Sequence, residues 1–296
     1  MKKISPKSNW LNTSILVTGS AGFIGQHLVE SLIKQGYKVF AKSRSDGDVR
    51  NIETWKKYPK ADCVVHLAGL TFVPDSWINP ELFISSNSVS TNNSLEYCRT
   101  NDAKLVFPST YMYSTNSFEP AKESEALNPV NPYALSKFLG ESLCRYYSEF
   151  FDVRVAILRP FNVYGVGQSD RFLVPSVIRQ ARLGDEIRVQ DSKPSRDYLY
   201  INDLIEAIRL VVETEINFDI FNLGTGKSYS VEALINVLEQ VVGRELRISS
   251  AKTERQSEIN FTRADISHAT EVLRWNPRWS LLDGLSEIWI RSIDSC

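Results

Sequence analysis

The sequence predicts an α/β fold built around a doubly wound parallel sheet, and three observations lead to this prediction. Through the first two-thirds of the 296-residue chain, short β-rich runs alternate with longer segments of helical periodicity. The β-rich runs are apolar at successive positions, which is typical of strands buried on both faces. Enough chain separates one run from the next for a crossover helix, the connection that parallel strands require.

The first strand–helix–strand unit shows these features clearly. SILVTG at 14–19 is an apolar run that ends in glycine and predicts a strand. Ile24, Leu28 and Leu32 follow at helical spacing, and Gly36 marks the end of that helix. YKVFAK supplies the second strand. The later strands expected in this half are CVVHLAG at 63–69, KLVFPS at 104–109 and RVAILRP at 154–160.

After residue 165 the alternation loosens, which predicts a second and smaller lobe. Helices are expected near 203–213 and 231–242, with a strand and turn in FNLGTGKSYS between them. We expect residues 1–165 to form the sheet domain, which also receives segments near 195–220. Residues 166–296 would form mainly the smaller lobe, folded over the ends of the strands to leave a cleft.

Composition narrows the class of protein. The chain is 43% apolar and 23% charged with a formal net charge of −1, which gives no electrostatic reason to expect nucleic acid or a membrane surface as partner. The N-terminal segment lacks the apolar run of a secretory signal, and no window is long enough to span a membrane. We therefore expect a cytoplasmic protein. The four cysteines lie far apart without a CxxC pair, as reduced thiols do: Cys63, Cys98, Cys144 and Cys296.

The three histidines do not indicate a metal site. His27, His66 and His268 each have acidic residues or a cysteine nearby, but no second histidine or cysteine completes a zinc-type cluster. We expect each of them to pack or to form a hydrogen bond, and we expect no metal.

A glycine pattern follows the first strand. Gly19, Gly22 and Gly25 stand in TGSAGFIG, between the strand and the start of the helix. Glycine allows the backbone to turn tightly and to approach a pyrophosphate, and the helix N-terminus supplies unpaired N–H groups. This strand–turn–helix context predicts a dinucleotide site of the Rossmann type.

Candidate catalytic groups follow in the middle of the chain. Tyr133 and Lys137 are four residues apart in a segment expected to open a helix after Pro132, so their side chains share one face. An ammonium one turn away stabilises a phenolate and lowers the pKa of the phenol. Ser109 and Thr110 end a parallel strand, where ligands of open α/β sheets bind. A hydroxyl there could donate a hydrogen bond to a substrate oxygen that gains charge.

These motifs, in this order and spacing, resemble the extended short-chain dehydrogenase/reductase family, which contains the nucleotide-sugar epimerases, dehydratases and ketoreductases. The resemblance covers nearly the whole chain. Besides TGSAGFIG it rests on GDVR, HLAG, NPYALSK, LRPFNVYGVGQ, SRDYLYINDL, FNLGTG and ADISHATEVLRWNP. It implies the Rossmann-type sheet and the smaller substrate-binding lobe, and it implies a homodimer formed through helices near 80–100 and 131–150.

The resemblance also implies roles for the catalytic groups. Tyr133 is the acid/base for a sugar hydroxyl or ketone, and Lys137 both lowers its pKa and holds the nicotinamide ribose. The family's catalytic hydroxyl stands four places before a tyrosine in a [ST]-x-x-V-Y-G pattern. Aligning that pattern on MYS at 112–114 gives Ser109, with Thr110 as the adjacent possibility.

The remaining cofactor contacts come from the matched motifs. In GDVR, the Asp48–Val49 pair is expected to lie against the adenine. The full set implied for the cofactor is Gly19, Gly22, Phe23, Ile24, Gly25, Lys42, Ser43, Arg44, Asp48, Val49, Leu67, Ala68, Gly69, Tyr133 and Lys137.

The end of the second strand bears on which dinucleotide is bound. A carboxylate there would accept hydrogen bonds from the adenosine ribose and repel a 2′-phosphate. This chain instead reads Lys42, Ser43 and Arg44, and two cations with a hydroxyl suit a phosphate. We expect NADP(H), with NAD as the alternative. The stretch from 42 to 48 is unusually short, so the residues at the end of the second strand do not align with the family position by position.

The substrate expected by resemblance is a nucleotide-diphosphate sugar. Asn162, Arg196 and Arg255 match family positions that touch the diphosphate, and an arginine fork suits that group. Phe172 to Pro175, which include Val174, and Val189 are expected to line the base pocket. Thr110 is the further substrate contact.

Three functions are compatible with these residues. Dehydratases of the family carry Asp-Glu directly after the catalytic hydroxyl, but this chain has Thr110–Tyr111 or Tyr111–Met112 there, so elimination of water is not expected. The first expectation is an NADP(H)-dependent reductase of a nucleotide-linked 4-keto-6-deoxy sugar, and the alternative is an NAD-dependent nucleotide-sugar 4-epimerase. The third is a catalytically silent binding protein, against which the intact Ser/Tyr/Lys set argues.

Overall fold

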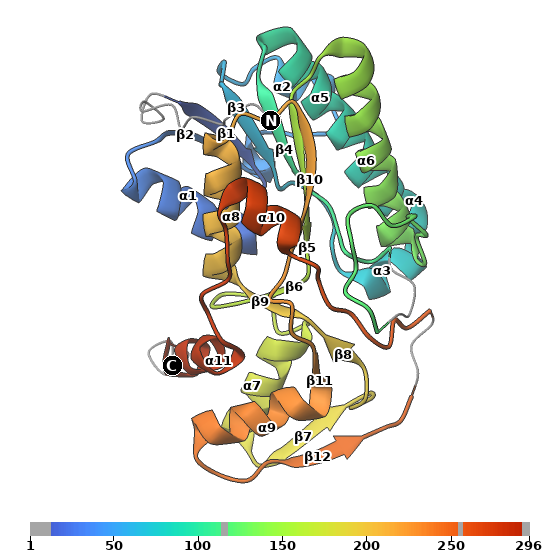
Figure 1. The fold of residues 1–296 in the computed structure, drawn as a ribbon, viewed down its shortest axis with the longest axis vertical. Coiled ribbons are helices and arrows are strands. Elements are labelled where there is room, and N and C mark those ends of the chain that lie inside the picture. The colour runs from blue at the N-terminus through green and yellow to red at the C-terminus, as the bar shows by residue number, and fades with distance from the viewer. Residues whose placement is uncertain (1–12, 114–117, 254–256, 292–296) are drawn as a thin grey trace.

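The computed structural model describes residues 13–113, 118–253 and 257–291. Figure 1 shows two lobes, a larger one around the central sheet and a smaller one below it. Six strands form the sheet, in the order β10-β5-β4-β3-β1-β2, and every neighbouring pair is parallel. The strands are β1 (Ser14–Thr18), β2 (Lys38–Lys42), β3 (Cys63–His66), β4 (Lys104–Pro108), β5 (Val155–Pro160) and β10 (Phe218–Leu223). The doubly wound parallel sheet is confirmed.

Alternating side chains of these strands build two separate cores. Ile15 and Val17 of β1 join one apolar cluster, whereas Leu16 between them joins the other. Successive residues of a strand point to opposite faces, so an apolar run buries both faces at once. Helices α1 (Phe23–Lys34) and α8 (Ile201–Glu213) cover the first face, and α5 (Ser90–Asn101) and α6 (Pro132–Phe151) cover the second (Figure 1).

The second strand is the edge of the sheet because little chain follows it. Between β2 and β3 there are only a short 3₁₀ turn, η2 (Arg44–Asp46), and one helical turn, α2 (Ile52–Trp55). No crossover in this segment carries a further strand past β2. The direction of strand addition therefore reverses beside β1, and the crevice at this switch point is the place where such sheets bind ligands.

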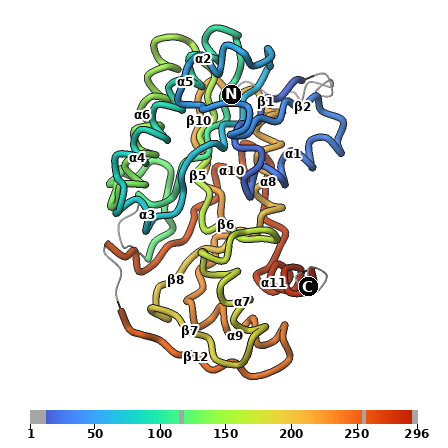
Figure 2. The backbone as a smooth tube through the Cα atoms, turned by 180° about the vertical axis from the view of Figure 1, so that it is seen from behind, coloured from blue at the N-terminus to red at the C-terminus, as the bar shows by residue number. Residues whose placement is uncertain are grey.

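The smaller lobe is built from short paired strands and three helices. Strand β7 (Glu186–Val189) pairs with β12 (Arg247–Ser250), and β8 (Ser195–Arg196) pairs with β11 (Tyr229–Ser230). The helices are α7 (Leu173–Leu183), α9 (Val231–Val242) and α11 (Leu281–Arg291). The view from behind in Figure 2 also shows this lobe below the sheet. Among the described residues, the remaining elements are α3 (Val73–Ile78), α4 (Pro80–Ile84), the π-helical turn η3 (Ser85–Val89), β6 (Asn162–Tyr164), β9 (Tyr198–Tyr200) and α10 (Ser267–Leu273).

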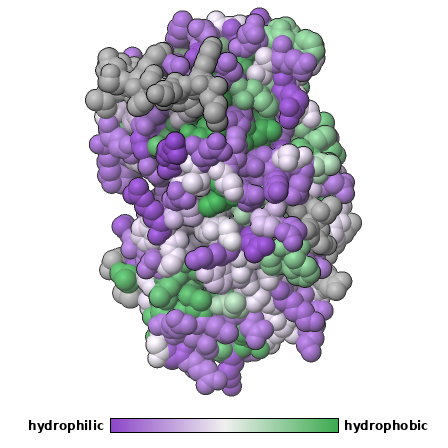
Figure 3. Space-filling view, in the orientation of Figure 1, coloured by the Kyte–Doolittle hydropathy of each residue, from purple (hydrophilic) through white to green (hydrophobic). Residues whose placement is uncertain are grey.

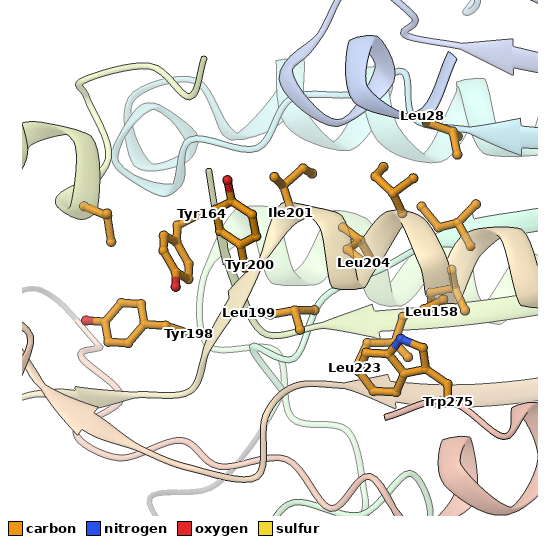
Figure 4. Packing of buried hydrophobic residues seen from close by; sticks show 14 of the residues in the cluster. Leu28, Leu158, Tyr164, Tyr198, Leu199, Tyr200, Ile201, Leu204, Leu223 and Trp275 are labelled. Carbon is orange, nitrogen blue, oxygen red and sulfur yellow. The ribbon is translucent and has the colours of Figure 1, made fainter. Parts of the chain in front are cut away.

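The first of the two cores continues from the sheet into the small lobe. Strands β6 and β9 pair between the lobes, and their residues Tyr164, Tyr198 and Tyr200 lie together at this junction (Figure 4). The chain then returns to the sheet through α8 and β10, where Trp275 is fully buried and donates to the Asp203 carbonyl at 3.0 Å. Packing that runs from sheet to small lobe fixes how the walls of the crevice face each other.

Surface and buried polar groups complete the fold. Polar residues cover most of the face seen in Figure 3, with apolar residues in small separate groups. None of the helices in the described part of the chain combines the length and apolar character needed to cross a membrane. Cys63, Cys98 and Cys144 are free thiols in the interior.

Each histidine has a hydrogen-bonding partner, as the sequence predicted. His27 contacts the Val166 carbonyl at 2.8 Å, and His268 contacts Asp219 at 2.8 Å. His66 lies between the hydroxyls of Thr18 and Ser90, at 2.8 and 3.1 Å.

Candidate active site

The glycine loop lies where the chain passes from β1 into α1. Gly19 has φ +70°, and a Cβ there would be 2.6 Å from the Ala68 nitrogen, so the close approach of these two segments requires glycine. Gly22 is the N-cap residue of α1, and no side chain caps this helix end. Its N–H groups are thus left for another acceptor, which is the arrangement that binds a pyrophosphate.

Residues 67–69 form the opposite wall of this crevice and are held by a residue that the motifs did not reveal. Asn87 accepts from the Leu70 N–H at 2.8 Å and donates to the Leu70 carbonyl at 3.0 Å. It also donates to the Ser136 hydroxyl on α6 at 2.8 Å. Asn87 is buried in the π-helical turn η3, a feature often found at functional sites. An isolated asparagine in a predicted helix carried no signal of this role.

Tyr133 and Lys137 share one face of α6, as their spacing predicted. Asn131 caps the helix by accepting from the Ala134 N–H at 2.8 Å, and Pro132 occupies the first turn. Lys137 is buried, with its Nζ donating to the Pro108 carbonyl at 2.7 Å and lying 4.8 Å from the centre of the Phe107 ring. Burial lowers the pKa of Lys137 to about 8.

The phenol of Tyr133 differs from the expectation. Lys137 was expected to lower its pKa, but burial raises the pKa of Tyr133 to about 12. The ammonium of Lys137 is directed to the Pro108 carbonyl and does not offset this rise. The Thr110 hydroxyl interacts with the phenol and offsets it in part. At neutral pH Tyr133 is therefore protonated in this structure.

The two candidate hydroxyls face different partners. Ser109 Oγ lies 2.9 Å from the hydroxyl of Tyr113, which is buried. Thr110 Oγ1 accepts from the Met112 N–H at 3.2 Å, so its proton is left to donate elsewhere, and it is the hydroxyl that interacts with Tyr133. The structure thus brings Thr110 to the Tyr133 phenol and turns Ser109 toward Tyr113.

A buried ion pair supports this strand end from behind. Arg159 donates to Glu141 through two nitrogens, at 3.0 and 2.7 Å, and both side chains are buried. The Arg159 guanidinium also lies 5.5 Å from the centre of the Tyr113 ring. Arg159 stays in this place because removal of one member of a buried pair would leave an uncompensated charge. Its contact with the Tyr113 ring holds Tyr113, and through it Ser109, in position.

The end of β2 corrects one expectation. The sequence placed no carboxylate there, but Asp46 folds back onto it. The 3₁₀ turn η2 is closed by a capping box, in which Asp46 accepts from the Ser43 N–H at 2.9 Å and from the Ser43 hydroxyl at 3.3 Å. Lys42 Nζ lies 3.1 Å from the same carboxylate. Asp46 was missed because it stands four residues after the last strand residue.

The neighbouring cofactor candidates lie along the same rim. Arg44 is exposed at the start of η2. Asp48 pairs with Arg50, whose Nε is 3.0 Å from Oδ1. The Val49 carbonyl accepts from the Trp55 indole at 2.8 Å and the Val49 side chain packs on the second core, so this turn is anchored.

Two of the expected substrate contacts, Asn162 and Arg196, lie at Tyr111. Asn162 Oδ1 accepts from the Tyr111 hydroxyl at 2.9 Å. Arg196 forms a mostly buried ion pair with Glu258 and lies close enough to Tyr111 to affect the pKa of that phenol. Val174 is buried at the start of α7. Arg255 lies outside the described residues.

Tyr111 is a second residue whose place the motifs did not give. Its ring stacks on Phe161 with the centroids 4.8 Å apart. It connects the region of Tyr133 to that of Asn162 and Arg196. The sequence indicated only that Tyr111 stands near the catalytic hydroxyl, where dehydratases of the family have a carboxylate.

A parallel doubly wound sheet with a glycine loop at its switch point and a Tyr/Lys pair beside it defines a dinucleotide-dependent enzyme. The family model "NAD dependent epimerase/dehydratase family" matches residues 15–224. The chain therefore belongs to this family, of the extended short-chain dehydrogenase/reductase type, and it is an oxidoreductase or an epimerase. The glycine loop, which leaves no room for a Cβ at Gly19, fits the NAD(P) cofactor of the family.

Relatives of both kinds are similar to the chain over nearly its whole length. A UDP-glucose 4-epimerase of Halalkalibacterium halodurans is 30% identical, covering 93% of this chain and 93% of its own. A GDP-6-deoxy-D-mannose reductase of Pseudomonas aeruginosa is 29% identical, covering 93% of this chain and 95% of its own.

Solved structures repeat this division. RMD from Pseudomonas aeruginosa, complexed with NADPH, superposes with a TM-score of 0.88 at 26% identity, covering 97% of this chain and 99% of its own. A UDP-glucuronic acid 4-epimerase from Bacillus cereus, with UDP-glucuronic acid and NAD, gives a TM-score of 0.86 at 28% identity, covering 95% and 99%. The general fold is thus shared by a protein that binds NADPH and by an epimerase that binds NAD.

Proposed function

We propose that this protein is an NADP(H)-dependent reductase of a nucleotide-linked 4-keto-6-deoxy sugar. The observation that carries the proposal is the pair of cations at the end of β2, Lys42 and Arg44, which together with the Ser43 hydroxyl suit the 2′-phosphate of NADP(H). A reductase needs a proton donor at the C4 oxygen. Tyr133, whose phenol burial keeps protonated at neutral pH, can supply that proton.

The chain's own residues perform the acid half of this reaction. When bound, NADPH supplies the hydride that C4 receives. Tyr133 gives its proton to the C4 oxygen as the carbonyl becomes an alcohol. Thr110, whose own proton is not used by Met112, donates a hydrogen bond to the same oxygen as charge develops there. Lys137 holds the nicotinamide ribose.

The diphosphate of the substrate is proposed to bind beside Tyr111. Asn162 and Arg196 lie in that region. The family resemblance implies Arg255, which is outside the described residues, as a further contact. Arg196 carries the charge and the fork geometry for a phosphate, and Glu258 balances this charge in the structure. Thr110 and Tyr111 provide no carboxylate, which argues against elimination of water.

The second candidate is an NAD-dependent 4-epimerase, and the Asp46 carboxylate at the end of β2 favours it. A carboxylate in this place accepts from the ribose hydroxyls of NAD. The H. halodurans relative is named for this activity. In such an enzyme the cofactor stays bound, because each hydride removed is returned within the same cycle.

The state of the cofactor separates the two candidates. The absorption spectrum of the protein as isolated is expected to show little bound NAD. Addition of NADPH and a nucleotide-linked 4-keto-6-deoxyhexose should then cause a loss of absorbance at the reduced nicotinamide band. Interconversion of UDP-glucose or UDP-N-acetylglucosamine with its C4 epimer by protein that carries tightly bound NAD would contradict the reductase.

A homodimer is proposed as the assembly, as the family resemblance implies. Helix α6 exposes apolar side chains, with Phe150 61% and Tyr146 51% exposed, and Leu82 of α4 is 43% exposed. A two-fold pairing of α5 and α6 with a second copy would cover such residues. Sedimentation at micromolar concentration should give a dimer, and a monomer would contradict this assignment.

A further inference from the structure

We propose that Asp46 weakens the preference of this protein for NADP(H) over NAD(H) by competing with a 2′-phosphate for Lys42 and Ser43. This rests on the dinucleotide site of the proposed function, but not on the reaction carried out there. Asp46 thereby opposes the attraction that Lys42 and Arg44 exert on a 2′-phosphate.

The position of the carboxylate carries the first step. The Ser20 N–H donates to the Lys42 carbonyl at 3.0 Å, so the end of β2 lies directly beside the glycine loop. A dinucleotide whose pyrophosphate rests on that loop places its adenosine ribose at the end of the second strand. Asp46 occupies this place together with Lys42 and Ser43.

The contacts of Asp46 carry the second step. Its carboxylate takes the Ser43 N–H at 2.9 Å, the Ser43 hydroxyl at 3.3 Å and the Lys42 ammonium at 3.1 Å. A 2′-phosphate would require the same three donors, because a cation, a hydroxyl and a backbone N–H are the groups that bind phosphate oxygens. The carboxylate and the phosphate cannot both hold them.

The two dinucleotides therefore meet Asp46 differently. The 2′-hydroxyl of NAD(H) can donate to the carboxylate where it stands, and Lys42 remains paired. The 2′-phosphate of NADP(H) must displace the carboxylate from Lys42 and then remain near a like charge. The Asp46 side chain is 33% exposed, so it can turn toward solvent without losing buried contacts.

Direct binding of the two reduced cofactors tests this proposal without a substrate. For Asp46→Asn we expect the affinity for NADPH to rise about tenfold, because a short-range repulsion and a competitor are removed. The affinity for NADH should fall a few-fold, since a neutral amide is a weaker acceptor than a carboxylate. Titration calorimetry at constant ionic strength measures both dissociation constants.

Two further variants make the result specific. Glu53→Gln removes the same charge from the adjoining helical turn, where Glu53 pairs with Lys56 at 2.6 Å, and should leave the NADPH/NADH ratio unchanged. In a Lys42→Ala background, Asp46→Asn should gain less for NADPH than in the wild type, because the contested cation is gone and only the like-charge repulsion is relieved.

The proposal is wrong if Asp46→Asn changes both affinities equally or if Glu53→Gln reproduces its effect. It is also wrong if Asp46→Asn raises the affinity for NADPH as much in the Lys42→Ala background as in the wild type. Failure of the reductase assignment looks different. In that case the ratio of affinities would respond to Asp46 as expected, while no nucleotide-linked keto sugar would oxidise NADPH.

Discussion

At the scale of single residues, burial controls the chemistry of Tyr133 more than its neighbour Lys137 does. The side chain of Tyr133 is 8% exposed, and its pKa is raised to about 12, which keeps the phenol protonated. Lys137 is equally buried, and its pKa falls to about 8. The pair therefore consists of a phenol that stays protonated and an ammonium that loses its proton above about pH 8, rather than of an activated phenolate.

Removal of the Tyr133 hydroxyl should abolish turnover and spare the cofactor. Tyr133→Phe keeps the ring and its packing but removes the transferred proton, so we expect kcat to fall by at least about 100-fold. The dissociation constant for NADPH should stay within about twofold, because only Lys137 of this pair holds the ribose. Substantial activity of Tyr133→Phe in the NADPH oxidation assay would show that another group donates the proton.

Lys137 predicts an upper limit to the active pH range. Since burial lowers its pKa to about 8, the ammonium is present below that pH and is lost above it, whereas Tyr133 keeps its proton throughout. We expect kcat/KM to decline above about pH 8. Lys137→Arg keeps the charge and should remove this decline at a lower overall rate. A wild-type profile that stays flat to pH 10 would contradict a role for the charged form.

The sequence could reach some of these residues but not the way they pair. Spacing and motif order were enough to bring Tyr133 and Lys137 to one face of α6. The choice between Ser109 and Thr110 depends on which direction adjacent hydroxyls take as a strand ends, and only Tyr113 and Met112 decide that. The position of Asp46 could not be predicted either, because a tight turn reverses the chain within four residues of the end of β2.

At the scale of elements, a buried lysine joins the sheet to the helix that covers it. Lys104, at the start of β4, is 6% exposed, and its Nζ donates to three carbonyls at the end of α8. These are the carbonyls of Val211, Val212 and Thr214, at 2.6, 2.9 and 3.0 Å. The last carbonyls of a helix have no partners within it, and a cation suits the negative end of the helix dipole.

Lys104→Met should therefore destabilise the fold without touching the site. The methionine would fill much of the same space but leave the three carbonyls without their donor, which we expect to lower the free energy of unfolding by about 1–3 kcal/mol. Urea unfolding followed by circular dichroism measures this difference. Lys34→Met on the exposed face of α1 is the control and should change little, since its ion pair with Glu30 is solvent-exposed. Equal stability of Lys104→Met and wild type would show that the carbonyls need no cation.

The elements themselves followed from the sequence more readily than their connections did. The sheet strands stand where apolar runs predicted them, because strands buried on both faces leave a strong pattern. The segment between β2 and β3 was harder to read, since a motif that resembles the family stands after an unusually short turn. The structure shows the consequence, which is that β2 forms the edge of the sheet.

At the scale of the whole molecule, the neutral His66 ties stability to pH. His66 is buried between Thr18 and Ser90, and burial lowers its pKa to about 3. As pH falls below the ordinary value of about 6.5, His66 takes up a proton in the unfolded chain but not in the folded one. The stability that the neutral histidine contributes is thus lost progressively between about pH 6.5 and pH 3.

A substitution isolates this contribution. His66→Asn should be less stable than wild type at pH 7, because it loses packing, but the gap should narrow by up to a few kcal/mol toward pH 4. Unfolding in urea at several pH values measures it. Parallel pH dependences of His66→Asn and wild type would mean that His66 titrates alike in both states.

A reductase transfers the nicotinamide hydrogen of NADPH to C4 of the sugar, and isotope labelling tests this transfer directly. The protein is incubated with NADPH that carries deuterium at the transferable position of the nicotinamide, and with a nucleotide-linked 4-keto-6-deoxyhexose. We expect one deuterium at C4 of the product sugar for each NADPH oxidised, with the new hydroxyl proton supplied through Tyr133. A keto sugar that gains no deuterium while the NADPH pool stays unchanged, together with interconversion of UDP-glucose and its C4 epimer by the same protein, would contradict the reductase and establish the epimerase instead.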